Sequence, residues 1–70
     1  MILQTNQGMT WVQEPSEGSD GYFCHYCYGG NEGITDFCDT EDEAAKAAIL
    51  ECMTLLNEDL ERMLDALKDL

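Results

Sequence analysis

Basic residues are the scarcest group in this chain. Lys and Arg together number 3 against 15 Asp and Glu, which gives a formal net charge of -12 over 70 residues. Such an acidic chain repels nucleic acid and anionic membranes and attracts cationic surfaces. We therefore expect no direct contact with nucleic acid or membrane, and a partner that is the basic surface of a protein or of a ribonucleoprotein complex.

Long apolar runs are also missing. No segment approaches the roughly 18 apolar residues that a membrane span requires, and the first residues show no basic and hydrophobic leader. We therefore expect a cytoplasmic protein whose four cysteines stay reduced. No set of Ser, His and acidic residues suggests a nucleophile and its base, and no phosphate-binding loop is present, so the chain is not predicted to be an enzyme.

The apolar content, 44%, is nevertheless high enough for one folded domain over residues 1–70. Residues 1–38 are predicted to form an antiparallel β-meander from β-prone runs at 2–5, Trp11–Val12, 22–28 and 34–38. Residues 15–21 are predicted to be an exposed, mobile loop, and residues 29–33 a glycine-rich reversal. The meander has three strands, or four if residues 2–5 pair.

A long helix is predicted after the meander, which makes the fold class α+β. Thr40 and Glu43 form a capping box, so the helix should start at Glu41. Apolar residues then stay within one half of the helical wheel to the end of the chain. These residues are Ala45, Ala48, Ile49, Cys52, Met53, Leu55, Leu56, Leu60, Met63, Leu64, Leu67 and Leu70.

The unbroken phase favours one helix over residues 41–70, although Asn57 is a competent N-cap and two helices broken near Thr54–Asn57 remain the alternative. A single helix would be roughly 45 Å long, whereas strands of five to seven residues span only about 17 to 23 Å. The sheet therefore cannot cover the whole apolar face, and a homodimeric interaction module that pairs through this face is an alternative function.

The acids of the helix fall into two groups. Those around its start are explained by the positive end of the helix dipole. The later acids lie opposite the apolar face, and those nearest the C-terminus oppose the dipole, so their mutual repulsion suggests a use. They repeat about every 5 to 10 Å, similar to the phosphate spacing of a nucleic-acid strand. The predicted partner-binding residues are Glu51, Glu58, Glu61, Asp65 and Asp69.

The cysteines allow a second interpretation. Cys24 and Cys27 have the C-x-x-C spacing of half a zinc site, and Cys38 and Cys52 would complete four ligands. However, the second pair lacks that spacing, and a regular strand would direct Cys24 and Cys27 to opposite faces. Buried structural thiols are therefore favoured over zinc. A small zinc-binding adaptor stays open as an alternative function.

The whole chain resembles anti-CRISPR proteins, the small inhibitors that phages encode against bacterial defence. The resemblance rests on its size, its acidity and a β-meander followed by a capped, alanine-rich helix, Thr40-Glu-Asp-Glu-Ala-Ala-Lys-Ala-Ala. It implies a non-catalytic protein that acts in the host cytosol. There it would occupy the basic nucleic-acid groove of a CRISPR effector complex.

Overall fold

The computed structural model describes residues 1–5 and 7–69, and its dominant element is the single helix α1 (Glu41–Lys68). Thr40 caps it, because its hydroxyl accepts a hydrogen bond from the Glu43 amide at 3.1 Å. The helix does not break near Thr54–Asn57; the Thr54 hydroxyl donates instead to the Leu50 carbonyl at 3.0 Å. The α+β class and the start at Glu41 are thus confirmed, and residue 70, predicted to be helical, lies outside the described residues.

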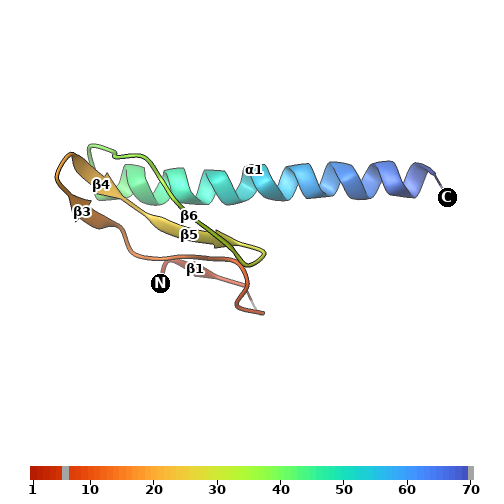
Figure 1. Cartoon of the computed structure of the whole chain (residues 1–70), viewed down its shortest axis with the longest axis horizontal. Coiled ribbons are helices and arrows are strands. Elements are labelled where there is room, and N and C mark those ends of the chain that lie inside the picture. Colours follow the sequence, from red (N-terminus) through yellow and green to blue (C-terminus); the bar gives the residue numbers. More distant parts are fainter. Residues whose placement is uncertain (6, 70) are drawn as a thin grey trace.

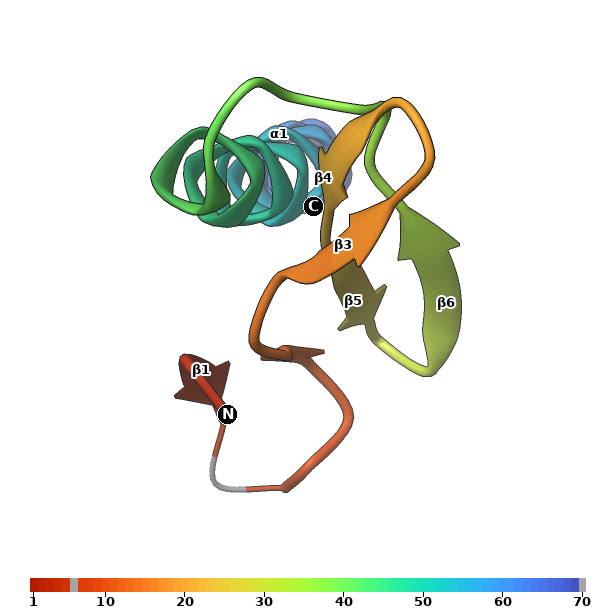
Figure 2. The same ribbon diagram turned by 90° about the vertical axis from the view of Figure 1, so that its left-hand side faces the viewer.

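Four antiparallel strands form the main sheet in the order β1-β2-β5-β6, and a separate two-stranded sheet pairs β3 with β4 (Figures 1 and 2). All the strands are short, with two to four residues each. Their bounds are β1 Leu3–Gln4, β2 Trp11–Val12, β3 Ser16–Gly18, β4 Gly21–Phe23, β5 His25–Tyr28 and β6 Asn31–Ile34.

Three predictions for residues 15–33 are wrong in detail. Residues 15–21 are not wholly a loop, because Ser16–Gly18 pairs with Gly21–Phe23 across a tight turn whose Gly21 has φ 140°. The aromatic run 22–28 is two strands, since it is interrupted at Cys24. The reversal needs only Gly29 and Gly30, with φ 58° and 89°, so the last strand begins at Asn31.

The last strand also lies earlier in the chain than the predicted strand 34–38. Only Ile34 belongs to β6, and Cys38 joins Tyr22 in an isolated bridge. The chain between them runs from the sheet to the start of α1. This segment is tied to the sheet by the Thr35 hydroxyl, which accepts from the Cys24 amide at 3.0 Å.

The core lies between the sheet and the first half of α1. Small helix residues allow the helix backbone to approach the strands closely, and three tyrosines from β4 and β5 pack around the contact. Its buried members are Val12, Cys24, Ala44, Ala48 and Cys52, with Tyr22, Tyr26, Tyr28, Cys38 and Ile49 partly buried against them.

The second half of α1 projects past the sheet (Figure 1). The molecule is therefore elongated, with principal extents of 51 × 21 × 16 Å. As predicted, the sheet is too short for the helix, and six side chains of the predicted apolar face remain 49–67% exposed. They are Met53, Leu56, Leu60, Met63, Leu64 and Leu67. In the described chain, no helix is long and apolar enough to cross a membrane.

Candidate functional site

The structure gathers the five predicted binding acids on one exposed side of α1. We call Glu51, Glu58, Glu61, Asp65 and Asp69 the acidic face; every one of them is exposed. Their positions fall within roughly 80° of the helix circumference at 100° per residue. Glu58, Glu61 and Asp65 belong to the half of α1 that projects past the sheet, and Asp69 is its C-cap, so no strand lies beside these four (Figure 1).

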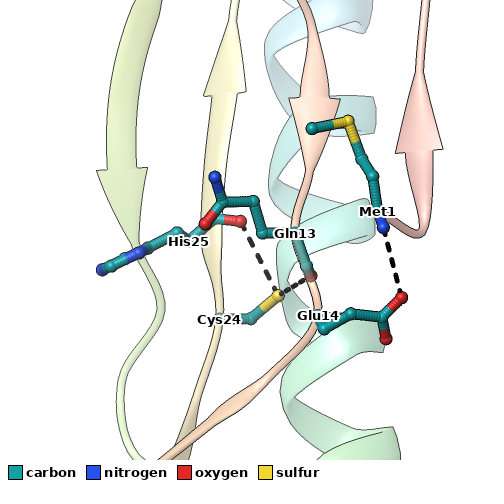
Figure 3. Close-up of polar contacts among 5 residues, drawn as sticks. All are labelled: Met1, Gln13, Glu14, Cys24 and His25. Carbon is teal, nitrogen blue, oxygen red and sulfur yellow. Dashed lines mark hydrogen bonds and ion pairs between the residues drawn. The ribbon is translucent and has the colours of Figure 1, made fainter.

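Little positive charge offsets this face. Among residues 1–5 and 7–69, the structure contains two ion pairs, and neither involves the acidic face. One joins the amino group of Met1 to Glu14 at 3.4 Å (Figure 3). The other joins Arg62 to Asp59 at 2.8 Å on the helix itself. Arg62 and Lys68 are the bases nearest to this face on α1, and they leave most of its negative charge exposed to solvent.

Asp59 is an acid that sequence reasoning placed in neither group. It is half-buried, and its two carboxylate oxygens accept hydrogen bonds from the Tyr28 hydroxyl and from Arg62, both at 2.8 Å. That hydrogen bond, more than desolvation, raises the pKa of Tyr28. The contact marks the point where the helix leaves the sheet. Because it joins residues 31 positions apart, no local sequence pattern could have revealed it.

The cysteines pack as small core residues. Cys24, Cys27 and Cys52 are buried, and all four thiols are free. The Cys24 thiol donates to the carbonyl oxygen of Gln13 at 3.1 Å, and it lies 3.7 Å from the carbonyl oxygen of His25 (Figure 3). The Cys27 thiol donates to the Met9 carbonyl at 3.3 Å.

Burial is the main reason that the pKa values of the Cys24 and Cys52 thiols are raised. A raised pKa favours the neutral thiol over the thiolate that a metal ligand or nucleophile requires. Within the described ranges, no group of three or more His, Cys, Asp or Glu side chains is placed to hold a metal ion. The four cysteines named as zinc ligands therefore do not come together as one site.

Comparison with known protein families, curated proteins and solved structures finds no match to this chain. The site must therefore be interpreted from its own chemistry. That chemistry is a set of unpaired, exposed carboxylates on a projecting helix, which can attract and orient a cationic surface.

Proposed function

We propose that this chain is a non-enzymatic binding protein that presents its acidic face to a basic surface of a protein partner. One observation carries the proposal. The five carboxylates of the acidic face are exposed on one side of a helix, and none forms an ion pair within the described residues. Acids that served only to stabilise the helix would be concentrated at its start, where the dipole favours them.

The placement of the acids opposes stability. Glu58 and Glu61 are three residues apart, and Glu61, Asp65 and Asp69 follow at intervals of four, so like charges are neighbours along the helix. Asp65 and Asp69 also lie near the negative end of the helix dipole. A domain with so thin a core bears this cost, and no ion pair among residues 1–5 and 7–69 compensates it. A cationic partner would relieve the repulsion and gain a fast, electrostatically guided association.

A nucleic-acid groove is the kind of basic surface that this face fits best. Successive carboxylates along the helix are about 5 to 10 Å apart, similar to the separation of phosphates on a strand. A protein that occupies such a groove would exclude the nucleic acid and act as an inhibitor. A CRISPR effector complex in the bacterial cytosol is one target of this class, as the resemblance to anti-CRISPR proteins implies.

A matched pair of charge variants tests the proposal. The face variant carries Glu58→Gln, Glu61→Gln and Asp65→Asn. The control variant removes the same charge from exposed acids of the sheet region: Glu17→Gln, Asp20→Asn and Glu32→Gln. Both are tagged and used to capture proteins from a bacterial lysate at low and high salt, with elution by a single-stranded oligonucleotide.

We expect the wild type and the control variant to capture the same nucleic-acid-binding protein. Salt and the oligonucleotide should both release it, because the contact is electrostatic and the groove is shared. The face variant should no longer capture this protein. Equal capture by the two variants, or a captured protein that nucleic acid does not displace, would refute the proposal.

A further inference from the structure

The exposed apolar residues of α1 follow a coiled-coil register that the fold itself does not use. Apolar side chains recur at alternating intervals of four and three residues, which is the spacing of positions a and d in a heptad. We call this set the apolar seam; it consists of Ile49, Met53, Leu56, Leu60, Met63 and Leu67. Ile49 is half-buried against the core, and the other five are 51–67% exposed.

The seam begins in an apolar groove beside the sheet. Residues of the β1–β2 hairpin, including Leu3 and Met9, form one wall of the groove, and Ile49, Met53 and Leu56 of α1 form the other. Its volume is about 450 Å³. The seam continues along the projecting half of α1, which extends past the strands (Figure 1). Each molecule therefore offers a groove at one end of the seam and a bare helix at the other.

The charges around the seam favour a second copy of this chain as its occupant. In the heptad register, four members of the acidic face take the outer positions: Glu51, Glu58 and Asp65 are at f and Glu61 is at b. The flanking e positions hold Leu50, Asn57 and Leu64, and the g positions hold Cys52, Asp59 and Ala66. Pairing two seams would therefore bury apolar surface while the acidic faces of both copies point away from the contact.

The exposed apolar area of the seam is also large enough for a stable dimer interface. The five exposed seam residues and Leu64 are each half to two-thirds exposed, so together they present roughly 600 Å² of apolar surface, at the upper end for a monomer. Two such surfaces, together with the groove, reach the approximately 1,200 Å² at which stable protein interfaces begin.

We propose that two copies of this chain pair antiparallel along the apolar seam, so that the projecting half of each helix lies in the groove of the other. The two-fold axis would pass between Leu56 and Leu60, placing Leu56 of one copy against Leu60 of its partner. Met63 and Leu67 of each copy would then cover the partner's Met53 and Ile49. Every exposed seam residue gains a partner, and the interface is closed.

Lys46 sets the antiparallel orientation. It lies seven residues before Met53, so it occupies the next a position of the seam. A parallel pair would place the two Lys46 side chains opposite each other. An antiparallel pair instead places each Lys46 beside the last turn of the partner helix, where the dipole is negative and Asp69 is near. The two helix dipoles also oppose each other only in the antiparallel pair.

Sedimentation of the reduced full-length chain tests the pairing. We expect a monomer–dimer equilibrium across a roughly hundredfold range of protein concentration. Leu60→Glu places a charge at the centre of the seam, so the dissociation constant should rise by about 100-fold or more. Ile34→Glu is the matched control, because Ile34 is 59% exposed on β6, the edge of the main sheet opposite the β1 strand that lines the groove; it should leave the dimer intact.

Met63→Glu provides a second seam variant at a side chain that is 67% exposed and makes no core contact. Far-UV and near-UV circular dichroism at low concentration establish that each variant is folded. A wild type that stays monomeric over the whole concentration range would overturn the proposal. Dimers that withstand both seam substitutions would overturn it as well.

Lys46→Gln tests the orientation at low salt. In the antiparallel pair it removes an attraction to the partner's helix end, so the dimer should weaken by about 3-fold. In a parallel pair it would remove a repulsion and tighten the dimer, which would contradict the proposed arrangement. The pairing does not use Glu58, Glu61 or Asp65, so the acid-to-amide variants of the acidic face should still dimerise whether or not they bind a basic partner.

Discussion

The two halves of α1 share one helix and one apolar periodicity but bury very different amounts of surface. In residues 41–56, the covered half, Ala44, Ala48 and Cys52 are buried against the sheet. In residues 57–68, the projecting half, Leu60, Met63, Leu64 and Leu67 are 49–67% exposed. The small residues thus make the internal contact, and the large ones are left outside.

The direction of the apolar residues explains this difference. The sheet-facing line of Ala44, Ala48, Cys52 and Leu55 is rotated by about 100° around the helix from the apolar seam. The helix therefore has two apolar lines with different uses. Small side chains bring the helix close to strands, whereas Leu and Met at heptad spacing suit packing against another helix. The sheet-facing line thus stabilises the fold, whereas the apolar seam, which includes Met53 and Leu56 of the covered half, stays exposed.

The largest expected effect comes from placing the same charge in each half. Ala48→Glu buries a carboxylate in the core without a partner and should cost about 3 kcal/mol or more, enough to unfold so small a domain. Ala66→Glu, at an exposed position, should leave the monomer folded. Urea unfolding followed by Trp11 fluorescence at low protein concentration measures both. Similar losses in the two variants would contradict the division of the helix.

The contrast between the halves also shows what the sequence could reveal. Helical periodicity placed the acidic face correctly, because exposure of carboxylates such as Glu58 and Asp65 follows directly from phase. The same periodicity did not separate the sheet-facing line from the apolar seam. It places residues of both lines in one half of the helical wheel, because it takes no account of side-chain size. Ala44, which is fully buried, lies just outside that half of the wheel, on the sheet-facing side of the helix.

The sheet was harder to predict than the helix. Its strands have two to four residues, too few to show a reliable alternation. Ser16–Gly18 pairs despite a loop-like composition, because the partner strand Gly21–Phe23 supplies the hydrogen bonds. The interruption at Cys24 depends on Thr35, eleven residues away, and the Tyr28–Asp59 contact spans an even greater separation. Such long-range contacts are decided by the packed fold.

A smaller effect is expected where the two halves meet. Tyr28→Phe removes the hydrogen bond to Asp59 and should lower the free energy of unfolding modestly, because the acceptor that loses its partner is charged but partly solvated. Amide hydrogen exchange in residues 57–62 should speed up, since the helix loses its last attachment to the sheet. Tyr22→Phe is the control, as the Tyr22 hydroxyl makes no hydrogen bond with the described residues.

The stabilisation that the Tyr28–Asp59 hydrogen bond gives to the fold should depend on pH. Its pKa is raised above the ordinary value of 10.0, so the folded state holds the phenol proton more tightly than the unfolded state. The wild type should have a higher free energy of unfolding than Tyr28→Phe. This difference should be complete below pH 10.0 and decline as pH rises through the raised pKa. Urea unfolding at several pH values measures this difference. A difference that grows with alkaline pH would contradict the role assigned to the hydrogen bond.

The smallest effect is a gain in stability from the acidic face itself. Glu58→Gln, Glu61→Gln and Asp65→Asn together should stabilise the monomer by about 0.5 to 1 kcal/mol, because neighbouring like charges and the helix dipole both oppose these acids. The gain should shrink at high salt, where the repulsion is already screened. Removing the same charge at Glu17, Asp20 and Glu32 should give a smaller gain in stability, since these acids are not neighbours on a helix. If the face variant gains no more than this control at low salt, the acids impose no local cost on the helix, and the stability argument for their use in binding is wrong.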